Sequence, residues 1–175
     1  SLHDLWDALK ALDLAEPGAL GIANIVSCPG TDSCKLGIPS SMGLAKAVEE
    51  EVNSWGDLLD DPGVQKIRIK MSGCPNGCGL HHIANIGFHG AAVKGPEGSQ
   101  IPSYELFLGG SYDEGDARLG LRTRTKVPAK RMPEATKSII SFYVDQRNDG
   151  EEFKDFAARV GAQAFEPVLV EFKDV

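Results

Sequence analysis

The chain has 175 residues, of which 42% are hydrophobic and 25% charged, and its formal net charge is −7 at pH 7. This composition is ordinary for one soluble globular domain, and the negative balance argues against nucleic acid as a partner. No apolar run approaches the roughly 20 residues of a membrane helix, and no stretch is laid out as a signal peptide. We therefore expect a cytoplasmic protein. Because the chain begins at Ser1 rather than at a methionine, we also expect a piece of a longer chain.

The N-terminal segment is expected to be a short amphipathic helix within residues 3–19. Leucines at positions 5, 9 and 12 recur at helical spacing. The dipeptide Pro17-Gly18 is expected to end the pattern.

The next two elements flank the first cysteines. Residues 21–28 are apolar and β-prone, so they predict a buried strand that runs into Cys28. Residues 40–55 predict a helix with Ser40 or Ser41 as its N-cap. Its expected inner face consists of Leu44, Val48 and Val52.

The middle of the chain reads as three strands. Residues 64–72 alternate apolar and polar side chains, which predicts a half-exposed strand that leads to Cys74. Residues 84–95 and 103–112 predict two more strands with glycine-rich ends, and residues 96–102 predict the loop between them.

The C-terminal third is expected to be helical with one final strand. Residues 133–150 predict a helix with Pro133 in its first turn, and residues 151–161 predict a second helix that Gly161 ends. The expected inner face of the first helix consists of Ile139, Ile140, Tyr143 and Val144. Residues 167–172 are a possible last strand. Strands and helices in this order indicate an α/β or α+β fold with a mixed sheet flanked by helices.

Four cysteines form two pairs, and each pair follows a predicted strand. Five residues separate Cys28 from Cys34 in SCPGTDSCKLG, and three separate Cys74 from Cys78 in SGCPNGCG. Glycines let the backbone approach a bulky inorganic group, and N–H groups in such turns can point at negatively charged sulfur. Thiolates are the ligands of iron–sulfur clusters and of zinc.

Three interpretations of the cysteines are open from their spacing. The first is a four-cysteine iron–sulfur cluster. The second is structural zinc, although zinc sites favour about two to four residues between paired ligands. The third is four unligated thiols or two disulfides. Because no export signal is visible, clustered cysteines favour metal or redox chemistry over disulfides.

The cysteine segments lead to a known family. Together with IGFHG at residues 86–90, they resemble the haem- and iron–sulfur-binding half of the sirohaem nitrite and sulfite reductases. YELFLGG at residues 104–110, with Arg118 behind it, is similar to the strand that closes that domain. Residues 127–161 are similar to its C-terminal helical region. We expect residues 21–175 to form this domain and residues 1–20 to be a helical lead-in from a preceding one.

The resemblance implies that the cysteines hold one 4Fe-4S cluster, with cluster-binding loops at the strand ends. The four ligands would be Cys28, Cys34, Cys74 and Cys78. By position, Cys78 would also bridge the cluster to the iron of sirohaem. Asn76 would shape its turn and contact a cofactor, or would be a plain turn residue. Thr31 and Ser33 would donate hydrogen bonds to cluster sulfurs, or would only cap their loop.

A basic segment follows the predicted strands. Within it, only Glu134 opposes seven basic residues: Arg118, Arg122, Arg124, Lys126, Lys130, Arg131 and Lys137. One interpretation is a solvated loop and helix start. The other is an anion site, where arginine would pair the carboxylates of sirohaem or an acidic ferredoxin would dock. Arg118 is the residue that we expect to contact the cofactor.

Three histidines follow the second cysteine pair, namely His81, His82 and His89. With four cysteines already present, we expect surface or turn histidines rather than metal ligands. A less favoured alternative is that they supply protons to the substrate.

The resemblance implies six-electron reduction of nitrite to ammonia or of sulfite to sulfide. No nucleotide fingerprint is present, so we expect a separate electron donor such as ferredoxin or a reductase subunit. The basic side chains that grip the substrate come mostly from the first half of such enzymes. We therefore assign no catalytic residue here, and we expect the N-terminal half of the same enzyme as a partner. The rival is an iron–sulfur electron-transfer or structural metal-binding domain without sirohaem.

Overall fold

A computed structural model describes residues 1–15 and 18–174 of the chain. Its longer helices are α1 (Leu2–Lys10), α2 (Ser41–Asn53), α4 (Met132–Gln146) and α5 (Phe153–Val160), with α3 (Pro62–Gln65) and α6 (Glu166–Val170) as short ones. Its strands are β1 (Val26–Ser27), β2 (Ile69–Ser72), β3 (Ile86–Lys94), β4 (Gln100–Leu108), β5 (Ser111–Asp113), β6 (Asp116–Arg118), β7 (Leu121–Arg122) and β8 (Val127–Pro128). Among these residues, no helix is both long and apolar enough to cross a membrane.

The main sheet is mixed. Its strand order is β1-β2-β3-β4-β7, and β8 also pairs with β4. β1, β2 and β3 run parallel to one another, whereas β4 is antiparallel to β3 over nine residue pairs. β5 and β6 form a separate hairpin. The expected α+β architecture, a mixed sheet flanked by helices, is therefore confirmed.

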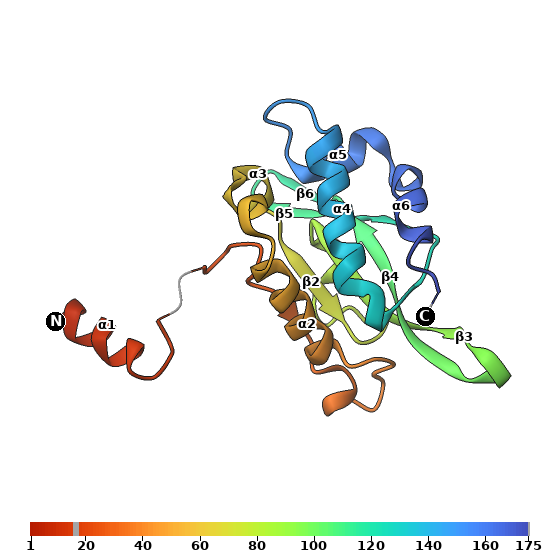
Figure 1. The fold of residues 1–175 in the computed structure, drawn as a ribbon, viewed down its shortest axis with the longest axis horizontal. Helices are drawn as coiled ribbons and strands as arrows, with labels where there is room; N and C mark the ends of the chain where they lie inside the picture. Colours follow the sequence, from red (N-terminus) through yellow and green to blue (C-terminus); the bar gives the residue numbers. More distant parts are fainter. Residues whose placement is uncertain (16–17, 175) are drawn as a thin grey trace.

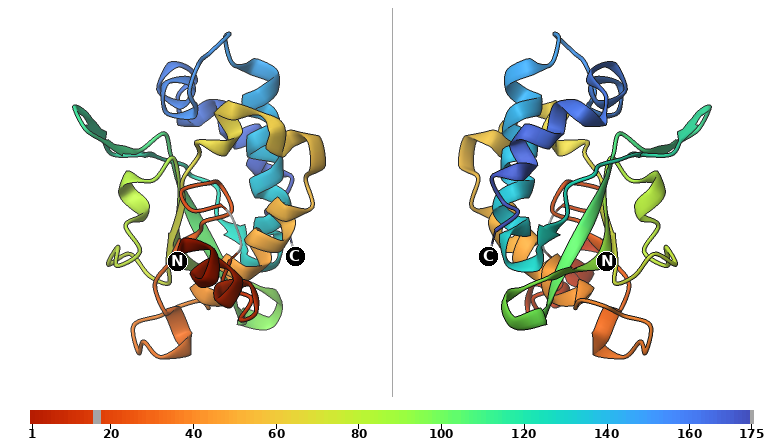
Figure 2. Two further views of the ribbon diagram at one scale, coloured as in Figure 1. Left: turned by 90° about the vertical axis from the view of Figure 1, so that its left-hand side faces the viewer. Right: turned by 90° about the vertical axis from the view of Figure 1, so that its right-hand side faces the viewer.

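Helices cover one face of this sheet (Figure 1). The leucine and valine face of α2, residues Leu44, Val48 and Val52, is buried as expected, and Ser40 is the N-cap. α4 buries Ile139, Ile140 and Tyr143. In the side views, α2 and α4 lie on one side of the sheet and the turn after the second cysteine pair lies on the other (Figure 2).

The expected strand at residues 21–28 is wrong in length and burial. Residues 18–24 form two successive turns, in which Gly21 donates to the carbonyl of Gly18 and Asn24 to that of Gly21. Only Val26–Ser27 pair with a neighbour, and Val26 is exposed because β1 is the edge strand.

The strand expected at residues 64–72 begins later and is more buried than predicted. Asp61 accepts hydrogen bonds from the N–H groups of Gly63 and Val64, which caps the short helix α3 at Pro62–Gln65. β2 then starts at Ile69. Because β2 lies between β1 and β3, Ile69 and Met71 are fully buried.

The last expected strand is a helix. Residues 166–170 form α6, where Pro167 stands in the first turn and Leu169 is fully buried. Proline is preorganised for a helix start, so it favours this outcome over a strand. The preceding helix α5 ends at Gly161 as predicted. The N-terminal helix is shorter than expected, and Pro17, its predicted stop, lies outside the described residues.

Candidate metal centre

The two cysteine segments meet because β1 and β2 are parallel. Ser27 pairs with Met71, so the carboxyl ends of both strands reach the same edge of the sheet. The N–H of Cys28 donates to the carbonyl of Met71 at 3.1 Å. The N–H of Ile38 donates to the carbonyl of Gly73 at 2.8 Å, which closes the first loop against the second.

Two glycines let these loops touch backbone to backbone. A Cβ atom on Gly73 would lie 2.7 Å from the Cα of Gly30. Gly30 itself has φ +58°, and a Cβ there would lie 2.5 Å from the backbone nitrogen of Ser41. A side chain at Gly73 would push the two cysteine segments apart, and one at Gly30 would push its loop away from the start of α2.

All four cysteines line one pocket at this strand edge. The pocket has a volume of about 230 Å³, and its walls include Leu36, Ser72 and Asn76 besides Cys28, Cys34, Cys74 and Cys78. The four thiols are free, which leaves the disulfide interpretation without support in this structure. Cys34 and Cys78 are exposed and Cys74 is buried, so the pocket opens to the surface on one side.

The surroundings of Cys28 favour its thiolate form. Its sulfur accepts the N–H of Gly73 at 3.1 Å and lies 3.3 Å from the hydroxyl oxygen of Ser41. Partial burial acts to raise the pKa of this thiol, but hydrogen bonds from Ser41 and from the backbone of Gly73 and Gly30 outweigh burial and lower the pKa. Metal ligands must be deprotonated, so this environment favours metal binding.

The arrangement suits a cluster better than a single ion. Among the described residues, no three histidine, cysteine, aspartate or glutamate side chains are gathered closely enough to hold one metal ion. Zinc would bring each sulfur to about 2.3 Å from a single point. A 4Fe-4S cluster uses a different iron for each cysteine, so its thiolates stand around a wider body. Four thiols spread around one pocket match that requirement.

The other predicted site residues fall into two groups. Asn76 lines the cysteine pocket. Thr31 and Ser33 are exposed on the loop between Cys28 and Cys34 and are not among the lining residues. Arg118 lies outside the pocket wall, on β6, where its guanidinium contacts Asp116 and Asp155 at 2.7 and 3.0 Å. A cofactor role for Arg118 stays a prediction.

Most of the basic segment is neutralised by carboxylates from other elements. Glu105 on β4 pairs with both Arg122 and Lys126, and Glu51 on α2 pairs with Lys137. Arg131 pairs with Glu134, the one acidic residue within the segment. Within the described part of the chain, Arg124 and Lys130 have no carboxylate in ion-pair contact. The segment is therefore mainly a structural ion-pair surface, with little free charge for an acidic donor.

The expectation of surface or turn histidines is wrong for His89, while His81 is a turn histidine that does not lie at the surface. His81 begins the turn η3 (His81–Ile83) but is fully buried, and His89 is buried on β3. His82 is half-buried, with its ring centroid 3.8 Å from that of His81. Alternation of apolar and polar residues along β3 could have shown that His89 is buried. Side chains on both faces of that strand are buried, however, so the pattern did not distinguish buried from exposed positions.

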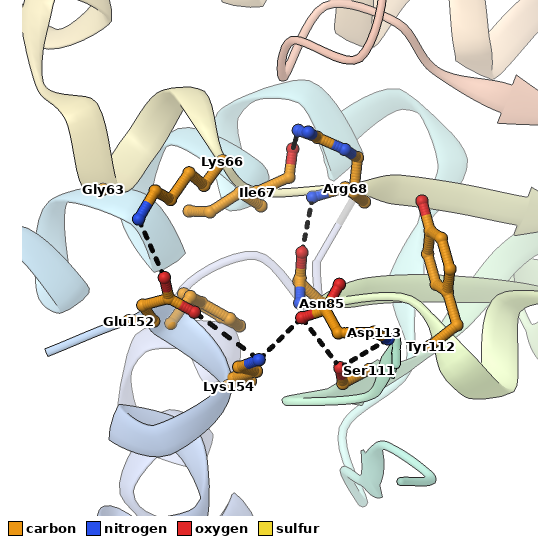
Figure 3. Close-up of a pocket in the computed structure, with 11 residues that line it drawn as sticks. Gly63, Lys66, Ile67, Arg68, Asn85, Ser111, Tyr112, Asp113, Glu152 and Lys154 are labelled. Atoms are coloured by element: carbon orange, nitrogen blue, oxygen red, sulfur yellow. Dashed lines mark hydrogen bonds and ion pairs between the residues drawn. The ribbon is translucent and has the colours of Figure 1, made fainter. Parts of the chain in front are cut away.

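A second pocket, of about 210 Å³, lies beside the amino ends of β2 and β3, where Arg68 and Asn85 line it (Figure 3). Lys154 dominates it: this buried ammonium contacts Asp113 at 2.6 Å, Asp116 at 2.9 Å and Glu152 at 3.5 Å. The hydrogen bonds that Lys154 donates to Asp113 and Asp116 raise its pKa, with Asp113 the largest contributor. The charge of Lys154 is thus satisfied within the protein, and its ion pairs join α5 to the β5–β6 hairpin.

Comparison with known proteins agrees with this site. The family model described as the nitrite and sulphite reductase 4Fe-4S domain matches residues 18–173. The chain is therefore a member of the nitrite and sulphite reductase 4Fe-4S domain family, as the cysteine segments suggested.

Two curated relatives illustrate the similarity. Sulfite reductase (ferredoxin) 2 of Mycolicibacterium paratuberculosis is 29% identical over 163 residues, which cover 90% of this chain and 28% of the relative. The sulfite reductase (NADPH) hemoprotein beta-component of Geobacillus kaustophilus is 29% identical over 140 residues, which cover 79% of this chain and 22% of the relative. The chain thus spans less than a third of the length of these relatives.

Solved structures give the same result. The Mycobacterium tuberculosis NirA protein matches with a TM-score of 0.77 and 26% identity over 94% of this chain and 30% of NirA. Dissimilatory sulfite reductase I matches with a TM-score of 0.64 at 14% identity, over 86% of this chain and 52% of its own, which supports the fold alone.

Proposed function

We propose that this chain is the 4Fe-4S- and sirohaem-binding part of a nitrite or sulfite reductase, an oxidoreductase that adds six electrons to its substrate. The observation that carries the proposal is the single pocket that all four cysteines line. Membership of the 4Fe-4S domain family and the names of the curated relatives support it. The relatives favour sulfite as substrate, and nitrite remains the alternative that the family description allows.

The chain's own residues would hold and tune the cofactors. Cys28, Cys34, Cys74 and Cys78 would be the cluster ligands, and the exposed Cys78 would also face the sirohaem iron. A cluster and a haem, when bound, supply one-electron transfer and substrate reduction. The N–H of Gly73 already donates to the sulfur of Cys28, and such hydrogen bonds raise the reduction potential of iron–sulfur clusters.

The substrate site would require another part of the enzyme. The chain covers 28% of the ferredoxin-dependent relative and 22% of the NADPH-dependent one. We therefore propose that an N-terminal half supplies the substrate-binding side chains. The donor would be ferredoxin or a reductase subunit, the two kinds of donor that the relatives' names carry. On this proposal the isolated 175 residues would not turn over substrate.

The test uses the full-length parent protein, purified without oxygen. Its iron and zinc contents and its ultraviolet–visible spectrum are measured, followed by activity with nitrite and with sulfite. We expect about four irons for the cluster and one for the haem per chain, with a Soret band. Zinc in place of iron would overturn the proposal, and iron without a Soret band would favour an electron carrier that lacks sirohaem.

Cysteine variants connect the result to this pocket. Cys34→Ser and Cys74→Ser should each lose most of the cluster iron, because serine is a poor ligand for iron in such clusters. Ser33→Ala is the matched control, since Ser33 is exposed on the same loop and lies outside the pocket wall. Full iron content in both cysteine variants would contradict the proposed ligand set.

A further inference from the structure

A row of polar contacts runs across the sheet from the cysteine pocket to Glu105 on β4, through the paired residues Ser72, His89 and Glu105 and the ring of His81. Ser72 lines the pocket, and its hydroxyl oxygen lies 2.9 Å from Nδ1 of His81. Nε2 of His81 lies 3.3 Å from Nδ1 of His89. Nε2 of His89 lies 3.3 Å from a carboxylate oxygen of Glu105. The four residues come from β2, η3, β3 and β4, and all are nearly or fully buried.

The carboxylate of Glu105 determines which atom donates and which accepts in each of these contacts. Burial acts to raise the pKa of Glu105, but hydrogen bonds from Arg122 and Lys126 outweigh burial and lower the pKa. Glu105 is therefore an acceptor only, so Nε2 of His89 must donate to it. A neutral imidazole has one donor and one acceptor, which makes Nε2 of His81 donate to His89 in turn. Nδ1 of His81 is then an acceptor, and the hydroxyl group of Ser72 donates a hydrogen bond to it.

One additional proton on His81 would change only the hydrogen bond between His81 and Ser72, at the cysteine pocket. If Nδ1 of His81 is protonated, both of its nitrogens donate and Ser72 becomes an acceptor. The N–H of Gly79 already donates to the same oxygen at 3.0 Å. The oxygen of Ser72 then accepts from both Gly79 and His81, so its hydroxyl hydrogen no longer points at His81. It can then point into the pocket that the four cysteines line.

We propose that reduction of the group held by the four cysteines is coupled, at neutral pH, to uptake of one proton at His81. The proposal rests on the proposed function, because it requires a redox group in this pocket. One electron enters from an external one-electron donor, and one proton enters from solvent onto Nδ1 of His81. Ser72 then turns its hydroxyl from His81 toward the reduced group. On reoxidation both the electron and the proton leave.

The surroundings of His81 set its protonation state before reduction. Burial lowers the pKa of His81 to about 3, with smaller contributions in the same direction from His82 and His89, so the ring starts neutral. His89 is also kept neutral, since burial lowers its pKa more than Glu105 raises it. The ring of Phe107, at 5.0 Å from that of His81, adds no charge. Added negative charge in the adjacent pocket acts in the opposite direction and favours the imidazolium form.

The test is the pH dependence of the reduction potential in the full-length holoprotein. Spectroelectrochemical titrations are run from about pH 6 to about pH 9, which brackets the ordinary histidine range. In the pH range where His81 is neutral in the oxidised protein and protonated in the reduced one, each tenfold fall in proton concentration should lower the midpoint potential by about 59 mV. His81→Phe should give a potential independent of pH. His82→Gln is the matched control, because His82 stacks on His81 but takes no part in the row of contacts from Ser72 to Glu105. This variant should keep the wild-type slope.

Two milder variants protect the test against a misfolded His81→Phe protein. Ser72→Ala should shrink the slope, because the hydroxyl that connects His81 to the pocket is gone. Glu105→Gln should move the sloping region to lower pH, because the nearest negative charge to the imidazole pair is removed. A wild-type potential independent of pH, or a wild-type slope retained in Ser72→Ala and Glu105→Gln, would overturn the inference. Absence of cluster absorption in the wild type would instead defeat the proposed function.

Discussion

Gly73 decides how closely the two cysteine segments approach. Its N–H donates to the sulfur of Cys28, and its Cα side faces the backbone of Gly30 with no room for a methyl group. The sequence showed glycines around the cysteines, but only the structure shows which of them lies between the loops. The contact exists because β1 and β2 end together.

We predict that Gly73→Ala will destabilise the fold and empty the site. The new Cβ would lie 2.7 Å from the Cα of Gly30, and the backbone must move to relieve that contact. Overpacking of this kind costs about 1–3 kcal/mol. Urea unfolding of this chain gives the free energy, and iron analysis of the full-length protein gives the occupancy of the site.

The control for that variant is Gly43→Ala on α2. There the new methyl would lie 3.0 Å from the hydroxyl of Ser40, the N-cap of α2, and alanine is the better helix former. We expect its stability to stay within about 1 kcal/mol of wild type. Equal loss of iron in both variants would contradict a specific role for Gly73.

At the scale of elements, an aromatic cluster joins the C-terminal helices to one another. Phe156 on α5 lies 5.5 Å, centroid to centroid, from Phe142 and 5.4 Å from Tyr143, both on α4. It also meets Phe165, in the turn before α6, edge to face at 5.9 Å. The 3.6-residue pattern predicted α4 and α5. It could not show that α6 replaces the expected strand, because six apolar-rich residues suit either element until Pro167 and the buried Leu169 are seen in place.

We predict that Phe156→Ala will cost about 3–5 kcal/mol of unfolding free energy, because it removes a fully buried ring from the centre of this cluster. The measurement is the urea midpoint with an unchanged denaturant slope. Val170→Ala on α6 is the matched control, since Val170 is 44% exposed and its loss should cost less than about 1 kcal/mol. A loss below about 1 kcal/mol for Phe156→Ala would mean that the cluster does not hold the helices.

At the scale of the whole molecule, the two ends of the chain differ in how they pack against the rest of the structure. None of the residues of α1 is buried, and α1 stands apart from the sheet in Figure 1. At the other end, Leu169 and Phe172 are buried, and the carboxylate of Glu166 accepts the backbone N–H groups of Arg124 and Thr125. We propose that residues 1–20 are a lead-in from a preceding domain and that residues 21–175 form the domain itself.

Two truncations test this division. Removal of residues 1–17 should leave the unfolding free energy within about 0.5 kcal/mol of the full chain, because no described residue of that segment is buried. Removal of residues 166–175 should unfold the domain or cost several kcal/mol, because it exposes the core around Leu169. The melting temperatures of the two truncated chains decide the matter. A large loss from the N-terminal truncation would make α1 part of the domain.

The sequence by itself determined the cysteine pairs, the strand that leads to each, the inner faces of α2 and α4, and the family. These features depend on residues close together in the chain, where spacing and turn chemistry act directly. Its misses have a tertiary cause, since the burial of residues 64–72 and the nature of residues 167–172 depend on what packs against them.

Only the tertiary structure decided which distant residues meet. Parallel pairing of β1 and β2 gathers four thiols into one pocket, and Glu105 on β4 neutralises Arg122 and Lys126 of a segment that looked uniformly basic. The row of contacts from Ser72 to Glu105 takes one residue from each of four elements. No spacing rule connects such residues, because the free energy that brings them together comes from burial of the whole core rather than from any local segment.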